Sequence, residues 1–403
     1  MKTKVGFFLI LLALYSFLLY FRPFFEKWVY AEYLGTIMGL ILVVSFVLTD
    51  STFNFFKNLF LTTGVIIATF SIPLLLTPDI TMSNSFFQGV YKLLVAFSLY
   101  FIVKWIFEYG GNQAVIFVKF LIVIAAINTF LGFLLFYYGI NFQTSSNVIG
   151  LDEASGRIAG MRGENYTGYW SAPLFSGILY QAFRKNIQIQ YRIFFMTVAL
   201  VGIISIILGL SRTGIISIIL IFLFTQYNSF HRSTNKLSRF ILLAVFTITT
   251  AIIADMFIDK LISSVLDQNI INEQTLRLHS DNRSYIWVSW LTTALDNPAG
   301  IGPGAILEKL NSHYGVVPHN SFLDIFVEYG FMGLVIMIII LTHVFRNFNL
   351  KSNDFTLVTL MGAFLGMLTS LFFLSNPFLP LHFIIAGGIV GRNRWLIQNG
   401  EHE

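Results

Sequence analysis

The chain has no cysteine and very little charge. Without cysteine, disulfides, thiolate catalysis and cysteine-ligated metals are excluded. Only 11% of its 403 residues are charged, whereas soluble domains carry about 25% charged residues. A chain so poor in charge cannot cover a globule with polar surface. The composition therefore argues against a soluble fold and indicates that a lipid bilayer is the solvent.

The chain also lacks the short motifs of metal and nucleotide sites. It has no His-Glu-x-x-His, no Asp-x-Asp in a predicted outer segment and no phosphate-binding P-loop. Basic runs interleaved with aromatic residues, which nucleic-acid binding would need, are missing too. No internal repeat is visible, although many transporters are built from two related halves. We therefore predict no metal, no cofactor and no nucleic-acid partner, and we consider a transporter less favoured.

What the chain has instead is hydrophobic sequence. Hydrophobic residues make up 56% of it, the mean hydropathy is +0.75, and apolar runs of membrane length recur. These runs lie near residues 5–21, 29–48, 59–77, 86–107, 114–138, 168–183, 193–210, 214–227, 241–258, 321–343, 355–374 and 378–391. We predict an all-α, polytopic helix bundle of about 12 spans that forms a single membrane domain over residues 1–403.

The placement of lysine and arginine predicts the orientation of the bundle. The short connections 184–192 and 228–240 are strongly basic, and such connections favour the cytoplasmic side. We therefore expect both termini in the cytoplasm. The first apolar run, 5–21, lacks a small-x-small cleavage site, so we expect a retained helix rather than a signal peptide.

Two predicted outer segments are too long to be simple turns. They are residues 139–167 and residues 259–320, and the second is a large loop between predicted spans 9 and 10. Loops of this length in a compact protein are usually functional or disordered. The larger loop mixes apolar and polar residues, which argues against disorder, and its stretch 296–304 is rich in glycine and proline. We expect this loop to carry part of a functional site.

Arg212 interrupts an apolar stretch, residues 193–224, that is too long for one span. The four residues 211–214, Ser-Arg-Thr-Gly, therefore predict a tight outer hairpin. A charge at a membrane boundary is costly unless it is solvated or paired, so it suggests a functional role. The alternative is a snorkelling arginine at a helix end.

Arg283 is a second outer arginine. Apolar residues recur downstream of it at Ile286, Trp287, Trp290 and Leu291, as they would on one face of a short helix. Arg283 would then lie in the first turn of that helix. The alternative is a solvated loop arginine that pairs with Asp281.

Arg157 and Arg162 lie in the smaller outer loop, and each adjoins a glycine. Glycine would let the backbone approach a ligand closely, although an ordinary polar loop would show the same pattern. Guanidinium groups bind phosphate oxygens through two hydrogen bonds. The outer arginines together therefore predict an anion site, for a lipid head group, a lipid pyrophosphate or an acidic sugar.

His319 stands at the outer mouth of a long apolar helix, beside Asn320. Neutral imidazole can accept a proton near pH 7, so His319 is a candidate base, although a lone histidine is more often structural. Asp324 and Glu328 lie one helical turn apart and follow it closely. They could orient the base or pair with an arginine.

Three segments, in this order along residues 140–340, resemble the motifs of the O-antigen polymerase/ligase superfamily. Residues 211–214 resemble its short arginine motif. Arg283, together with Trp290 and the glycines of 297–304, resembles its central loop segment. Residues 319–333, in which His-Asn is followed by nine residues, Gly, two residues and Gly, resemble its histidine motif. The loop that holds Arg157 and Arg162 matches only loosely.

The resemblance implies a metal-independent, multi-pass glycosyltransferase of the bacterial cytoplasmic (inner) membrane, active at its outer or periplasmic face. Members use glycans carried on undecaprenyl pyrophosphate. We expect a polymerase of O-antigen, capsule or exopolysaccharide repeat units. The alternatives are an O-antigen ligase or protein O-oligosaccharyltransferase of the same superfamily, or a transporter of lipid-linked sugar. The expected partners are the lipid-linked glycan, an acceptor glycan, the bilayer, a chain-length regulator and a flippase.

The resemblance also implies roles for individual residues. The expected catalytic residues are His319, which activates the acceptor hydroxyl, and Arg212 and Arg283, which stabilise charge on the pyrophosphate. The expected substrate-binding residues are Arg157, Arg162, Asn320 and Ser211. Whether the large loop brings His319 and the arginines together is a question for the structure.

Overall fold

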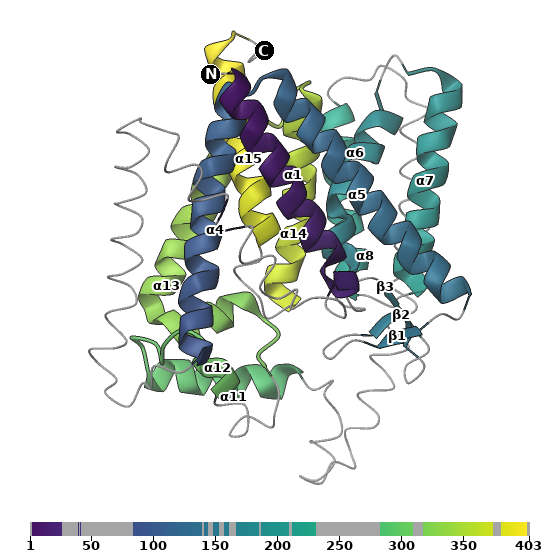
Figure 1. Ribbon diagram of the computed structural model, residues 1–403. Coiled ribbons are helices and arrows are strands. Elements are labelled where there is room, and N and C mark those ends of the chain that lie inside the picture. Colours follow the sequence, from purple (N-terminus) through teal and green to yellow (C-terminus); the bar gives the residue numbers. More distant parts are fainter. Residues whose placement is uncertain are drawn as a thin grey trace.

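A computed structural model describes most of the predicted bundle (Figure 1). The described residues are 2–25, 39, 41, 84–138, 141–143, 148–152, 157–160, 167–184, 187–208, 212–230, 283–308, 317–373 and 380–400. The helices are α1 Lys2–Phe25, α4 Asn84–Tyr109, α5 Asn112–Tyr137, α6 Thr167–Ala182, α7 Ile189–Leu208, α8 Arg212–Phe230, α11 Arg283–Asp296, α12 Ala305–Glu308, α13 Ser321–Arg346, α14 Phe355–Phe373 and α15 Pro380–Gln398.

Five of these helices are long and apolar enough to cross a membrane. The segments concerned are Lys4–Phe21, Gly89–Tyr109, Asn112–Leu135, Ser321–Arg346 and Phe355–Phe372. Shorter apolar segments, Ile189–Ile204 and Thr213–Ser229, lie in α7 and α8. The predicted helical membrane bundle is confirmed. The predicted runs 59–77 and 241–258, and nearly all of 29–48, lie outside the described residues, so the number of 12 spans stays a prediction.

A small element of another kind accompanies the helices in the outer segment 139–167. A small antiparallel sheet lies there, with β1 (Asn141–Gln143), β2 (Val148–Asp152) and β3 (Arg157–Gly160) in that order. Asp152 pairs with Arg157 across β2 and β3. Strands of three to five residues are too short for their alternation of apolar and polar side chains to be recognised in a sequence.

The N- and C-termini lie at the same end of the bundle, and the β-sheet, α11 and α12 lie at the opposite end, which we call the distal end (Figure 1). The end of α1 meets the start of α6 there, because the Tyr20 hydroxyl donates a 3.0 Å hydrogen bond to the Trp170 carbonyl. Both long predicted outer segments therefore contribute to one end of the molecule. Which membrane face this end meets stays a prediction.

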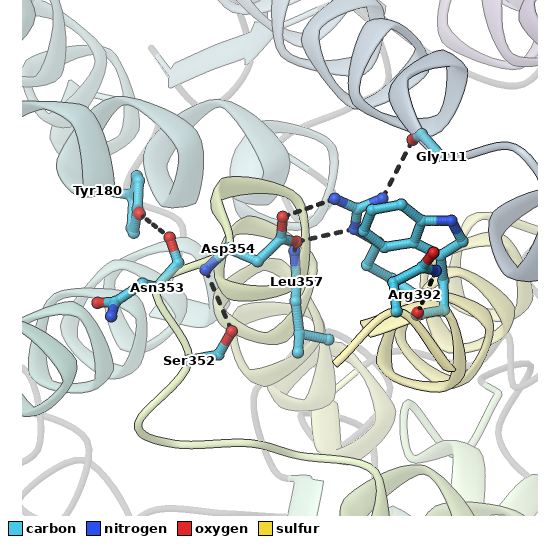
Figure 2. A network of polar contacts seen from close by, with 9 residues as sticks. Gly111, Tyr180, Ser352, Asn353, Asp354, Leu357 and Arg392 are labelled. Atoms are coloured by element: carbon cyan, nitrogen blue, oxygen red, sulfur yellow. Dashed lines mark hydrogen bonds and ion pairs between the residues drawn. The ribbon is translucent and has the colours of Figure 1, made fainter. Parts of the chain in front are cut away.

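The end of the bundle at which both termini lie, which we call the terminal end, is held by a buried ion pair (Figure 2). Arg392 of α15 donates hydrogen bonds of 3.0 and 2.8 Å to the carboxylate of Asp354, just before α14. It also donates to the Gly111 carbonyl, 3.1 Å away, in the turn between α4 and α5. The Asp354 carboxylate in turn accepts a hydrogen bond from the Leu357 amide and caps α14. Three elements are thus joined at one guanidinium group.

Glycines bring α15 against α4. A Cβ atom on Gly387 would collide with the Tyr100 carbonyl, and one on Gly391 would collide with the Lys104 carbonyl. Small residues four apart allow the backbones of two membrane helices to approach closely. The glycines that weaken the hydropathy of residues 378–391 therefore serve the packing of a helix in the bundle interior.

Candidate functional site

Asn320 begins α13 as its N-cap. Its backbone is extended, and its side-chain oxygen accepts hydrogen bonds from the amides of Phe322 (3.0 Å) and Leu323 (3.1 Å). A cap of this kind satisfies two amides that have no partner within the helix. The structure therefore shows Asn320 holding the entrance of the helix, and its contact with a substrate stays a prediction.

His319 has a left-handed backbone conformation, with φ at 52°. Among the described residues it is the one non-glycine residue with a positive φ. Such a conformation costs a residue with a side chain about 1–2 kcal/mol, and it often marks functional sites. The side chain is half-buried. The strained backbone turns the chain sharply just before the cap at Asn320, at the distal end of the bundle.

Trp287 of α11 connects this turn to the neighbouring helix. Its indole N–H donates a 2.7 Å hydrogen bond to the carbonyl of Pro318, the residue before His319. Arg283 is the first residue of α11, one helical turn before Trp287. The elements that carry Arg283 and His319 are therefore tied together within one turn of each residue.

The expected apolar face of α11 is only partly right. Ile286, Trp290 and Ala294 are buried, at spacings of four residues, in a core that also holds Ile301 and Val327. Leu291, which the sequence pattern placed on the same face, is exposed. Trp287 is not part of this core, and its indole N–H donates the hydrogen bond to Pro318. The fully buried Trp290 fixes α11 against α13.

The glycine-rich stretch 297–304 docks into a break in α13. Gly330 interrupts the helix with φ 66° and ψ −163°. The carbonyl of Val327 accepts a hydrogen bond of 2.8 Å from the Ile301 amide, and that of Glu328 accepts one of 3.0 Å from the Gly302 amide. The Phe331 amide donates to the Pro298 carbonyl at 2.9 Å. Main-chain groups released by the break thus find partners, as they must in a span-length segment.

This junction explains two glycines of the family-like motifs. A Cβ on Gly330 would collide with the Pro298 carbonyl, and a Cβ on Gly300 would lie 2.6 Å from the Glu328 carbonyl. Both residues also have positive φ. Helix α11 runs directly into this stretch. It is bonded to Pro318, just before α13, and the stretch is bonded to residues 327–331, so the first nine residues of α13 are held at both ends. His319 precedes that held segment.

Glu328 fastens the same loop with its side chain. Its carboxyl group accepts hydrogen bonds from the amides of Gly304 and Ile306, and Lys92 of α4 interacts with it electrostatically. These contacts give Glu328 a positioning role, and the expectation that it orients a base or pairs with an arginine stays a prediction. Glu328 holds the loop and α12 against α13.

Arg212 lies on the other side of the distal end, as the first residue of α8. Only three residues separate α7 from α8, so the connection is short, but Arg212, Thr213 and Gly214 of the predicted hairpin belong to α8. The Ser217 hydroxyl donates to the Gly366 carbonyl of α14 at 2.7 Å and lies 2.5 Å from the Thr369 hydroxyl. Helix α14 also packs against α13, so it is the element between Arg212 and His319.

The remaining predicted residues are less fully described. Arg157 is the first residue of β3, in the sheet at the distal end. Arg162 and Ser211 lie outside the described residues. Within the described ranges, no three His, Asp or Glu side chains gather as metal ligands would.

His382 is a buried polar residue that received no role from the sequence. Its Nε2 lies 3.1 Å from the Ser370 hydroxyl and 3.2 Å from the Met367 carbonyl. Its ring lies 4.8 Å from that of Tyr169. These contacts of His382 join α15 to α14 and to the beginning of α6. A histidine within an apolar run is the sequence signal that would have singled it out.

Helices of span length, together with His319 and the arginine-bearing elements at the distal end, indicate a membrane protein. Residues 196–338, from α7 to α13, match the O-antigen ligase family model. The match includes Arg212, Arg283 and His319 and supports the O-antigen polymerase/ligase superfamily, so the resemblance carried by the three motifs is confirmed. Members of the matched family are glycosyltransferase-like enzymes. None of the curated proteins matches the chain.

Proposed function

We propose that the protein polymerises oligosaccharide repeat units carried on undecaprenyl pyrophosphate, at the outer face of the cytoplasmic membrane. An acceptor sugar hydroxyl attacks the anomeric carbon of the donor. The bond from that carbon to the pyrophosphate oxygen breaks, and undecaprenyl pyrophosphate leaves. The observation that carries the proposal is the Trp287–Pro318 hydrogen bond, which ties the helix that begins with Arg283 to the turn that holds His319.

His319 accepts the proton of the acceptor hydroxyl in this reaction. Its backbone is fixed between a bonded carbonyl at Pro318 and a helix cap at Asn320. A base held in this way needs little reorganisation when the acceptor arrives, and positioned proton transfer typically contributes a factor of about 10²–10⁴ in rate.

Arg283 and Arg212 bind the pyrophosphate, with Arg157 or Arg162 as further contacts. The leaving group gains negative charge as its bond to the sugar breaks. Guanidinium groups that face this charge stabilise the transition state more than the ground state. Arg283 begins α11, which is hydrogen-bonded to the turn that holds His319. Arg212 begins α8 and would contact the donor from the side of α8 and α14.

The proposal is tested with purified protein and lipid-linked repeat units, by following chain growth. We expect His319→Ala and Arg283→Ala each to slow elongation by about 10²-fold or more, since each removes a group that acts in the transition state. Arg346→Ala is the matched control, because Arg346 is an exposed arginine at the opposite end of α13. Wild-type elongation by both site variants, at equal expression, would rule the assignment out.

The match to an O-antigen ligase model favours ligation as the second candidate function. The two are separated by the glycan profile of a deletion strain. Loss of polymer with a surviving one-unit product identifies a polymerase. Full-length polymer that stays on its lipid carrier identifies a ligase, and single units trapped on the cytoplasmic side identify a transport defect. A flippase that delivers the donor and a chain-length regulator are the partners that the polymerase would need.

A further inference from the structure

Helix α11 has no charged residue between its two ends. Arg283 begins it and Asp296 ends it, and the twelve residues between them are uncharged. One side packs into the protein through Trp290 and its neighbours. On the other side, Val288, Leu291 and Leu295 are 62%, 42% and 62% exposed. Their spacing of three and four residues makes one continuous stripe along the helix, which we call the α11 stripe.

Helix α11 is not apolar all round, because Thr292 is also exposed, but a continuous exposed apolar stripe without charge is typical of a surface that protein or lipid covers. Helix α11 is not a membrane span, because its 14 residues would reach only about 21 Å. It lies across the distal end of the bundle, at a steep angle to α4 and α13 (Figure 1). These features are typical of a helix that lies in the plane of a membrane interface.

The α11 stripe ends close to exposed apolar residues of a candidate membrane span. Three residues after Leu295, the Pro298 carbonyl accepts the hydrogen bond from Phe331 of α13. Phe331 is 62% exposed, and Met332, Ile338 and Ile339 are exposed further along the span Ser321–Arg346. Residues 297–304 are uncharged, and the charged residue between Leu295 and this stretch is Asp296, which ends the helix. Exposed apolar side chains therefore lie on both helices that meet at this junction, α11 and α13.

We propose that the acyl chains of the leaflet at the distal end cover the α11 stripe, so that α11 is an interfacial membrane helix. Its apolar side would lie about 5–10 Å into the boundary between head groups and acyl chains. Arg283 and Asp296, at its ends, reach the head-group level. The partner is the bulk lipid surface, and the assignment does not depend on the glycosyl transfer proposed above.

The absence of cysteine makes a direct test possible, because single-cysteine variants carry no background label. Val288→Cys, Leu291→Cys and Leu295→Cys are each labelled with an environment-sensitive fluorophore and placed in phosphatidylcholine nanodiscs. We expect lipids brominated near the head-group end of the acyl chain to remove most of the fluorescence, and aqueous iodide to remove little. Ile339→Cys is the lipid-facing control within a span, and Lys351→Cys, in an exposed turn at the terminal end, is the water-facing control.

Two results would overturn the proposal. Strong quenching by iodide without quenching by brominated lipid would show that the stripe faces water. Protection from both quenchers would show that protein, from another part of the chain or from a second copy, covers it. Neither result bears on chain growth, so a failure here is distinguishable from a failure of the proposed polymerase activity.

Discussion

Trp287 and Asn320 hold the backbone on either side of His319, and neither needs to touch a substrate to matter. Trp287 fixes the carbonyl before the histidine, and Asn320 caps the helix after it. The left-handed conformation of His319 persists because both neighbours over-determine it. At the residue scale, these contacts fix the backbone on both sides of His319.

Trp287→Phe replaces the indole by a smaller aromatic ring that has no N–H. The buried Pro318 carbonyl then loses its partner, which costs about 1–3 kcal/mol. We expect kcat for elongation to fall by about tenfold, the equivalent of about 1.4 kcal/mol, with the KM for the donor little changed. Thr292→Val is the control, because it removes a hydrogen bond of the same helix that does not reach the site. An unchanged kcat for Trp287→Phe would contradict the positioning role.

The sequence reveals His319 and the arginines because their spacing matches a family motif. It does not reveal the hydrogen bond of Trp287, because Pro318 is 31 residues away and an indole in an apolar helix face is usually core material. It predicts that Asn320 binds substrate, which stays a prediction, and it does not reveal that the Asn320 side chain caps α13. Contacts between distant segments depend on the folded backbone, which short motifs do not encode.

At the scale of elements, the junction between α13 and the stretch 297–304 organises the site. Hydropathy alone predicts one uninterrupted helix over residues 321–343, and it cannot show the break at Gly330 because the residues around it are apolar. The expected turn-rich stretch is present. Its docking depends on hydrogen bonds between main-chain groups that are about 30 residues apart, for which the sequence has no local signal.

Gly330→Ala is expected to separate the loop from α13. The added Cβ collides with the Pro298 carbonyl and also meets a backbone with φ 66° and ψ −163°, a region that is essentially restricted to glycine. Thermal unfolding in detergent should show a loss of stability, together with a loss of chain growth. Gly400→Ala is the matched control, because Gly400 has φ +70° with nothing within 4 Å of the added Cβ. Equal, small effects in the two variants would show that strain alone, and not docking, explains the glycine.

At the scale of the whole molecule, the two ends of the bundle differ in kind. The distal end gathers the strained histidine, the broken helix and three of the predicted anion-binding arginines, Arg157, Arg212 and Arg283. The terminal end is fixed by the ion pair of Arg392 and Asp354 (Figure 2). The sequence predicted the bundle and the common location of both termini, whereas the β-sheet escaped it because its strands are short.

Asp354→Ala should unfold the terminal end without altering the site. Removing one partner of a buried ion pair leaves an uncompensated charge at Arg392 and costs about 3–5 kcal/mol. We expect a clear drop in Tm, with chain growth per folded molecule preserved. Glu108→Ala breaks the looser 3.7 Å pair with the half-exposed Arg394, and its expected cost is at most about 1 kcal/mol. A selective loss of chain growth at unchanged Tm would contradict this division between the two ends.

The junction at Gly330 has a consequence for how such a protein can diverge. The three hydrogen bonds that hold stretch 297–304 against α13 join main-chain atoms, which every residue except proline can supply in full. Mutation can therefore exchange many side chains around the junction while the glycines keep it assembled. A scaffold of this kind can drift far in sequence, and can meet new sugars, without dismantling the turn that presents His319.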